Sequence, residues 1–119
     1  MKIRTQALTL LQLDYAVAKA NGDESRLLFE GDSDQGITGM RFDPHHAKWS
    51  PSTQWDQAGP IIDRERIDVF STSNGNGWFA QTNIRVYNAY GHTFLEAAMR
   101  CYVVSILGDE VEIPGELCK

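Results

Sequence analysis

The sequence predicts an α+β protein in which helices pack on the faces of an antiparallel sheet. Two helical patterns with capping boxes lie near the two ends of the chain, and short apolar runs fill the region between them. Two Asn-Gly pairs within 74–77 mark a tight hairpin, which joins neighbouring strands antiparallel. The expected order of elements is α-β-β-α-β-β-α, with the helices covering the apolar faces of the sheet.

Length and charge limit the possible functions. The chain has 119 residues, the size of one domain, and shows no internal repeat or linker. Eleven basic and sixteen acidic residues give a net charge of −5. A general nucleic-acid binder needs a basic face to displace counterions from phosphates, so this charge argues against nucleic acid as a partner.

The first helix is predicted over 9–21, where apolar residues recur at helical spacing. Thr9 and Gln12 fit a capping box, in which each side chain satisfies a backbone donor at the helix start. Gly22 is a natural end because glycine adopts the left-handed conformation that closes many helices.

Two short strands are expected next, over 26–30 and 37–42, joined by a turn-forming loop rich in Gly, Asp and Ser. Pro44 and Pro51 push their neighbours towards extended geometry, so the chain between them is expected to be irregular.

A middle helix is predicted over 52–65, with Ser52 or Thr53 as its cap. Pro60 lacks an N–H and clashes with the preceding turn. The helix is therefore expected to kink at Gly59-Pro60 or to restart with Pro60 in its first turn.

The remaining elements form a hairpin and a last helix. Strands are predicted over 67–72 and 78–87, the second as one long strand or two. The last helix begins at Thr93, which forms a T-x-x-E capping box with Glu96, and ends at Gly108. The tail after it is extended and acidic, and its two apolar residues, Val111 and Ile113, are expected to pack on the body.

The cysteines and the N-terminus indicate a reduced, cytosolic protein. Cys101 and Cys118 make neither a disulfide framework nor a zinc spacing, so both are predicted to be reduced thiols. The basic start resembles a secretory leader, but Gln12 and Asp14 interrupt the apolar segment that follows. No apolar run approaches the ~20 residues that span a bilayer, so no membrane association is expected.

No constellation of residues predicts catalysis, a metal or a cofactor. His45 and His46 are adjacent after Asp43, but adjacent side chains in an irregular segment point apart, which favours exposed loop histidines over a metal site. No serine lies in a nucleophile elbow, and no glycine-rich phosphate loop opens a helix. We therefore expect a protein that is not an enzyme.

The segment 48–55 is a candidate for ligand binding. Trp49 and Trp55 flank a hydroxyl-rich helix start. Indole rings stack on bases, and the unpaired backbone N–H groups near Ser52 and Thr53 could meet an anion. The alternative is structural: Ser52 or Thr53 caps the helix while the two tryptophans fill the core.

Two arginines extend the candidate site. Arg100 lies among apolar residues of the last predicted helix, either as the internal partner of a carboxylate such as Asp14 or as a ligand anchor. Arg85 belongs to the predicted hairpin, whose outer face is either an ordinary solvated surface or an association surface.

Three stretches of the sequence resemble one known family. They are 13–20 (LDYAVAKA), 49–62 (WSPSTQWDQAGPII) and 97–114, which begins AAMRCYV and ends LGDEVEIP. Together they resemble the NinX-type family of small proteins encoded by tailed phages and prophages of enteric bacteria. Members of that family usually have Asp where Gln54 stands, so this chain lacks that carboxylate.

The resemblance also carries an expectation about architecture. The NinX-type family is similar in layout to the phage ABA-sandwich domain, which shares the Ser-Thr start of the middle helix and the Ala-Arg pattern of the last. This similarity implies a three-layer α/β/α sandwich, with helices on both faces of an antiparallel sheet. Some proteins that resemble the broader group are anti-defence sponges, which hold cyclic nucleotide signals of bacterial immune systems without cleaving them.

Two functions follow as alternatives. In the first, the protein sequesters a small cyclic nucleotide as a homo-oligomer in the cytoplasm of the infected bacterium. Trp49 and Trp55 would then stack on bases, while Arg85 and Arg100 would meet phosphates. In the second, the protein is an interaction module that inhibits a host protein through an acidic surface, with the tail 109–116 as the natural contact.

Overall fold

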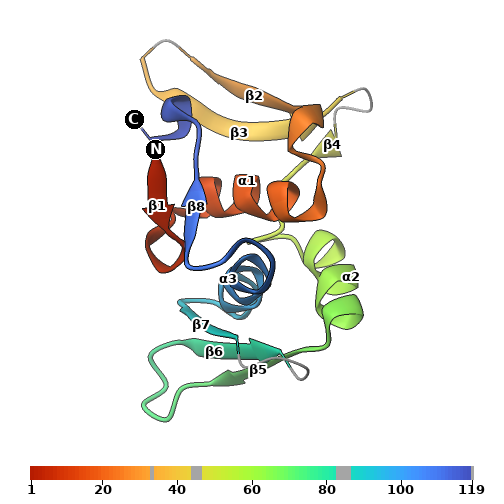
Figure 1. The fold of residues 1–119 in the computed structure, drawn as a ribbon, viewed down its shortest axis with the longest axis vertical. Helices are drawn as coiled ribbons and strands as arrows, with labels where there is room; N and C mark the ends of the chain where they lie inside the picture. The colour runs from red at the N-terminus through yellow and green to blue at the C-terminus, as the bar shows by residue number, and fades with distance from the viewer. Residues whose placement is uncertain (33, 44–46, 83–86, 119) are drawn as a thin grey trace.

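The chain alternates short strands with helices and is an α+β protein, as predicted. The computed structural model describes residues 1–32, 34–43, 47–82 and 87–118 (Figure 1). Within these ranges the elements are β1 (Lys2–Arg4), η1 (Thr5–Ala7), α1 (Leu10–Asn21), η2 (Glu24–Arg26), β2 (Leu27–Asp32), β3 (Gly36–Phe42), β4 (Ala47–Lys48), α2 (Trp55–Glu65), β5 (Ile67–Ser71), β6 (Trp78–Thr82), β7 (Asn88–Gly91), α3 (Phe94–Leu107), β8 (Glu110–Glu112) and η3 (Gly115–Leu117).

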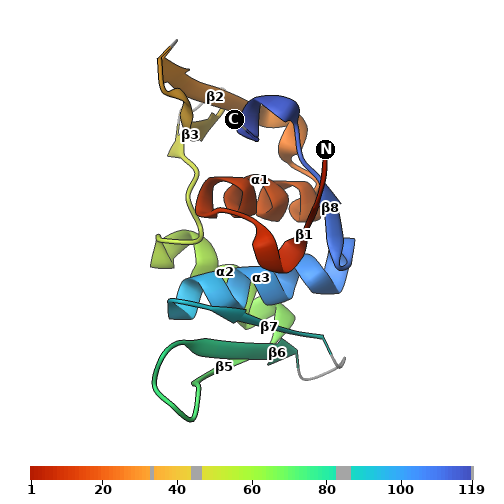
Figure 2. The same ribbon diagram turned by 90° about the vertical axis from the view of Figure 1, so that its left-hand side faces the viewer.

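The expected three-layer sandwich around one sheet is not confirmed. The strands of the described residues form three separate antiparallel sheets, in the orders β1-β8, β2-β3-β4 and β5-β6-β7. Figures 1 and 2 show the two three-stranded sheets at opposite ends of the molecule, with the helices between them. The separation arises because each of these sheets pairs only strands that are close in sequence, while α1 and α3 pack between the sheets.

The first helix has the boundaries that its sequence predicts. The Thr9 hydroxyl accepts a hydrogen bond from the Gln12 amide, and the Gln12 side chain accepts one from the Thr9 amide, so the capping box is complete. Gly22 closes the helix in the left-handed conformation with φ of 82°. Local capping chemistry therefore sets both ends of α1.

The middle helix begins later than predicted. Neither Ser52 nor Thr53 caps it; α2 starts at Trp55 after Gln54, which makes no side-chain capping bond. The Ser50 carbonyl accepts hydrogen bonds from the amides of Thr53 and Gln54, which closes a separate turn before the helix. The helix then continues through Pro60 to Glu65, and Pro60 does not restart it.

The hairpin forms at the predicted place. Strands β5 and β6 pair from Ile67 opposite Thr82 to Ser71 opposite Trp78, and Gly75 adopts a positive φ of 74° in the turn. The predicted second strand divides into β6 and β7, and residues 83–86 between them lie outside the described part of the chain.

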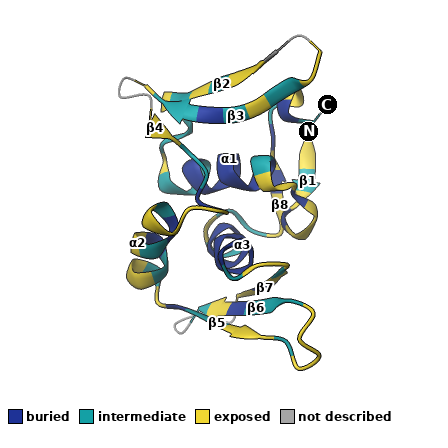
Figure 3. Ribbon diagram, turned by 180° about the vertical axis from the view of Figure 1, so that it is seen from behind, coloured by how far each residue is buried: buried dark blue, intermediate teal, exposed yellow. Residues whose placement is uncertain are grey.

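The core lies where α1 and α3 cross. Figure 3 shows these two helices as the most buried elements, while exposed residues are frequent along the hairpins. Cys101 and Cys118 are both free, as predicted, and burial raises the pKa of the Cys101 thiol to about 11. The largest completely buried apolar side chains include Leu13, Val17, Met40, Met99, Val103 and Ile113.

A two-stranded clasp joins the ends of the chain. Strand β1, which the sequence pattern did not indicate, pairs with β8 in the register Lys2 opposite Glu112 and Arg4 opposite Glu110. Val111 and Ile113 are buried, which confirms that the tail packs on the body. The clasp places basic residues of β1 directly across from the two strand carboxylates of the acidic tail.

Candidate functional site: a polar pocket over a buried ion pair

A pocket of about 440 Å³ opens where the first turn of α3 meets η1, the β5–β6 turn and the end of β7. We call it the hairpin pocket. Its volume lies within the ~300–1,000 Å³ range of small-molecule sites. The lining side chains that matter most are those of Asn74, Asn76, Trp78, His92, Glu96 and Arg100.

A buried ion pair lies at the inner side of the pocket. Glu96 and Arg100 are one turn apart on α3 and only 5% and 6% exposed. An Arg100 terminal nitrogen donates to a Glu96 carboxylate oxygen at 2.9 Å, and the other terminal nitrogen donates to the Thr5 carbonyl at 2.9 Å. The Arg100 Nε–H is also buried but has no partner among the described residues. One strong donor at the pocket is therefore unsatisfied, which costs free energy in the absence of a ligand or water.

The ion pair explains a departure from the predicted capping box. The Thr93 hydroxyl accepts a hydrogen bond from the Glu96 amide, as predicted. The Glu96 carboxylate turns to Arg100 instead of back to the Thr93 amide. The prediction that Arg100 has an internal carboxylate partner is thus right in kind, but the partner is Glu96 and not Asp14.

One wall of the pocket is the turn between β5 and β6. The Asn74 side-chain oxygen accepts hydrogen bonds from the Thr72 hydroxyl at 2.7 Å and from the Asn76 backbone amide at 3.0 Å. These bonds fix the orientation of the Asn74 amide group. Within the described chain its nitrogen makes no hydrogen bond, so two donors remain for a ligand.

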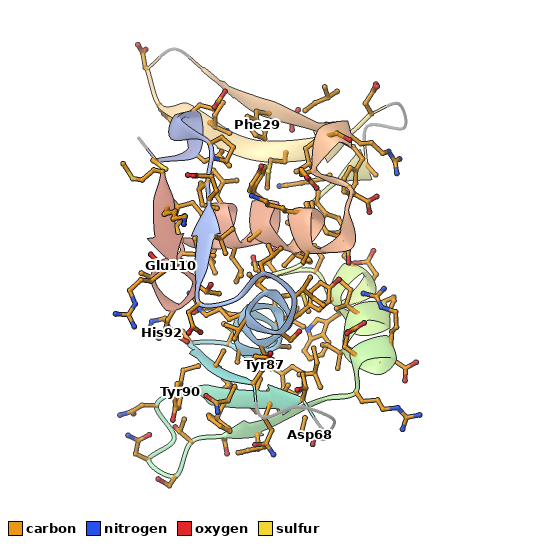
Figure 4. The ribbon with its side chains drawn as sticks, in the orientation of Figure 1. Phe29, Asp68, Tyr87, Tyr90, His92 and Glu110 are labelled. Atoms are coloured by element: carbon orange, nitrogen blue, oxygen red, sulfur yellow. The ribbon has the colours of Figure 1, made fainter. Side chains whose placement is uncertain are left out.

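The opposite wall is held by Gln6 of η1. Its side chain donates to the Tyr90 carbonyl at 2.9 Å and accepts from the Tyr90 amide at 3.2 Å, which ties the edge of β7 to η1. Figure 4 shows Tyr90 and His92 on the same side of the molecule, near the turn of the hairpin. Trp78 adds an aromatic surface and packs edge-on against Phe94 at 5.4 Å.

The five predicted ligand contacts that the structure describes lie at different places in the fold. Trp49 and Ser52 lie at a joint between α1 and the segment before α2. The Trp49 indole donates to the Asp14 carbonyl at 2.8 Å, and the Ser52 amide donates to the Asp14 carboxylate at 2.8 Å. This arrangement matches the structural interpretation of Trp49.

The other predicted contacts are scattered. Thr53 is exposed, and Trp55 is 60% exposed with its ring 5.0 Å from that of Phe94. Arg85, like His45 and His46, lies outside the described residues. Of the five predicted residues that the structure describes, only Arg100 lines the hairpin pocket.

Sequence reasoning missed most of the pocket. Asn74 and Asn76 were assigned only to a turn, and Trp78 only to a strand. The available signal was the spacing of Glu96 and Arg100, which places opposite charges one helical turn apart on a helix that is otherwise largely apolar. An ion pair on such a buried helix indicates a place where polar groups gather.

The described residues contain no group of three or more potential metal-ligating side chains, and none of their helices is long and apolar enough to cross a membrane.

The fold and the pocket define a class of protein: a small α+β protein with helices between small antiparallel sheets and a polar pocket over an ion pair within one helix. The chain belongs to the family described as Bacteriophage P22, NinX, whose family model matches residues 4–106. The resemblance seen in the sequence is thereby confirmed, and the matched range contains the whole lining of the hairpin pocket. No curated protein matches the chain.

Proposed function

We propose that the protein is a phage accessory protein that binds a small nucleotide in the hairpin pocket and holds it unchanged. A cyclic nucleotide signal of bacterial immunity is the ligand class to test first, and the infected cell's cytoplasm is the compartment in which such a signal would be met. The observation that carries the proposal is the unsatisfied Arg100 Nε–H, buried at a pocket that also offers Asn74 and Trp78.

The chemistry of the lining supports binding of a polar ligand. Arg100 and Glu96 form a buried ion pair within α3. The amide of Asn74 and the indole of Trp78 supply hydrogen bonds and stacking, and the imidazole of His92 and the hydroxyls of Thr72 and Ser73 add further polar groups to the lining. Such a set of groups suits recognition of a polar, planar ligand.

The test is a thermal-shift and native-mass screen against cyclic di- and trinucleotides and the cyclisation products of ADP-ribose. Saturation at a hundredfold excess over Kd is expected to raise Tm by roughly 10 °C. Heating the complex and identifying the released molecule then separates storage from turnover. Recovery of altered ligand would contradict the proposal, as would the absence of a shift with every member of the set.

A matched pair of variants locates the ligand. Asn74→Ala removes amide donors from the pocket, whereas Asn88→Ala changes an exposed asparagine of β7 that does not line it. We expect a loss of affinity of about tenfold for Asn74→Ala, the size of one or two neutral hydrogen bonds, and no change for Asn88→Ala. Equal effects of the two variants would place the ligand elsewhere.

A second candidate function, association with a protein, is favoured by a different observation. Phe70, Phe79 and Tyr90 lie side by side across β5, β6 and β7, with neighbouring ring centroids 5.1 and 5.0 Å apart. Phe70 is 46% exposed and Tyr90 54%. Exposed aromatic rows of this kind are typical of association surfaces, either for a host protein or for a second copy in a homo-oligomer.

The acidic tail gives the inhibitory alternative less support than the aromatic row does. Glu110 and Glu112 lie across from Arg4 and Lys2 in the clasp, so their charges are partly balanced. Phe70→Ser is the discriminating variant. If protein association is the function, Phe70→Ser abolishes the oligomer or the host complex while Asn74→Ala leaves it intact; the opposite pattern rejects this alternative.

A further inference from the structure

Building on the function proposed above, we infer that the hairpin pocket takes the uncharged, planar base of the nucleotide and leaves its phosphate groups at the mouth of the pocket, in solvent. Three observations favour a base in the pocket and phosphates in solvent. They are the charge balance of the lining, the donor geometry of Arg100 and the amide groups of the turn.

The charge of Arg100 is already balanced. Its partner carboxylate on Glu96 lies 2.9 Å away, and both side chains are almost completely buried. A phosphate brought to the same place would meet the negative charge of Glu96 in an environment that screens it poorly. The electrostatics of the pocket therefore favour a neutral group over an anion.

The donor geometry leads to the same conclusion. Both terminal nitrogens of Arg100 already donate one hydrogen each, one to Glu96 and one to the Thr5 carbonyl, and the third nitrogen, Nε, has no partner among the described residues. The remaining Nε–H suits one acceptor atom, such as a ring nitrogen or a carbonyl oxygen of a base. A phosphate is bound best by several converging donors or by a two-pronged guanidinium, and both terminal nitrogens of this arginine already donate to protein acceptors.

The turn supplies the groups that read a base. Asn74, oriented by the bonds to its oxygen, presents its NH₂ group, and Asn76 has an amide that can donate and accept. Side-chain amides match the donor and acceptor pattern of base edges. Trp78 offers a ring for stacking, which contributes about 1–3 kcal/mol per base in nucleic-acid binders.

The experiment compares ligands with and without phosphate by calorimetry on the full chain. The series contains the four common ribonucleosides, their 5′-monophosphates, ribose 5-phosphate and inorganic phosphate. We expect at least one nucleoside to bind within about threefold of its monophosphate and the two base-free phosphates not to bind. The affinity of that monophosphate is expected to change by less than about twofold between low and high salt, because no phosphate is paired with a cation.

The results that overturn the inference are distinct from those that overturn the proposed function. A monophosphate or cyclic nucleotide that binds at least tenfold more tightly than any nucleoside, or competition by inorganic phosphate, rejects the base-only pocket but keeps nucleotide binding. Binding of none of the nucleosides, nucleotides or cyclic nucleotides rejects both.

A variant of the ion pair gives a second, independent test. Glu96→Gln keeps the shape and an oxygen for Arg100 but removes the negative charge. The ratio of monophosphate to nucleoside affinity is expected to rise roughly tenfold, because the arginine is then free to attract an anion. Asp63→Asn, which removes an exposed carboxylate from α2, is the control and should leave the ratio unchanged. An unchanged ratio in Glu96→Gln would overturn the charge argument.

If Glu96→Gln fails to fold, Asn76→Ala replaces it. Asn76→Ala is expected to weaken nucleoside and monophosphate by the same factor, and a loss for the monophosphate alone would overturn the inference.

Discussion

Asp14 gives the protein a dependence of stability on pH that a single substitution can expose. Its carboxylate is 5% exposed and accepts a hydrogen bond of 2.8 Å from the Ser52 amide. Burial raises the pKa of Asp14 from 3.8 to about 7, and the hydrogen bond from the Ser52 amide opposes this rise by less. The folded protein therefore holds a proton on Asp14 at pH values where the unfolded chain has released it.

The sign and the size of the effect follow from this difference. Because folding raises the pKa of Asp14, the contribution of this group to the stability of the folded state is complete below pH 4 and is lost as the pH rises through 7. The rise of the pKa from 3.8 to about 7 corresponds to about 4 kcal/mol, at ~1.4 kcal/mol for each tenfold change in proton affinity. Asp14→Asn removes this titration. As the pH rises from 4 to 8, the free energy of unfolding of the variant is therefore expected to increase by about 4 kcal/mol relative to that of the wild type.

The assay is urea unfolding followed by circular dichroism at several pH values, for wild type, Asp14→Asn and Asp63→Asn. Asp63 is an exposed carboxylate of α2 and serves as the control. Groups other than Asp14 titrate equally in wild type and Asp14→Asn, so the difference between these two proteins isolates Asp14. A difference that is constant with pH, or that favours the wild type increasingly above pH 6, would refute the reasoning.

Further predictions concern packing and thiol chemistry. Gly91→Ala should cost about 1–3 kcal/mol in urea unfolding, because a Cβ there would lie 2.4 Å from the Ala97 amide nitrogen on α3. Gly115→Ala, where no atom lies within 4 Å of the added carbon, should be nearly neutral; equal losses would contradict the close packing of β7 on α3. Cys101 is 0% exposed and its pKa is raised to about 11, so it should not react with a thiol reagent at pH 8, whereas the half-buried Cys118 should. Modification of Cys101 first would show that α3 opens readily.

The sequence predicted those elements whose ends depend on local chemistry. The Thr9–Gln12 box and Gly22 act within one turn of the chain, and α1 has the expected ends. The start of α2 was misplaced because the Ser50 carbonyl and the Gln57 side chain bind backbone groups before the helix, a competition that capping preference alone does not reveal.

Elements stabilised by distant partners could not be predicted in this way. Strand β1 is three residues long and exists because it pairs with β8 at the other end of the sequence. The division into three sheets has the same origin, since the alternation of apolar residues predicts strands but not which strands pair.

The candidate site was partly visible in the sequence. The position of Glu96, three residues after Thr93 and four before Arg100, allowed either a capping box or an ion pair. The ion pair forms, and Arg100 also donates to the Thr5 carbonyl, which comes from the far end of the chain. Asn74 and Asn76 were identifiable as turn residues, but only the packing of the hairpin against α3 brings them to Arg100.

The positions of the three tryptophans have a practical consequence for spectroscopy. Trp49 packs on Phe42 of the sheet β2-β3-β4 and donates a hydrogen bond to α1. Trp78 belongs to the sheet β5-β6-β7 and lines the hairpin pocket, whereas Trp55 is exposed beside Phe94. Replacing Trp55 by phenylalanine leaves two tryptophans, Trp49 and Trp78, which can be excited selectively over the tyrosines. Quenching of one then reports occupancy of the pocket, and a shift in the emission of the other reports loosening of the joint at Asp14, so the two events can be timed separately in one sample.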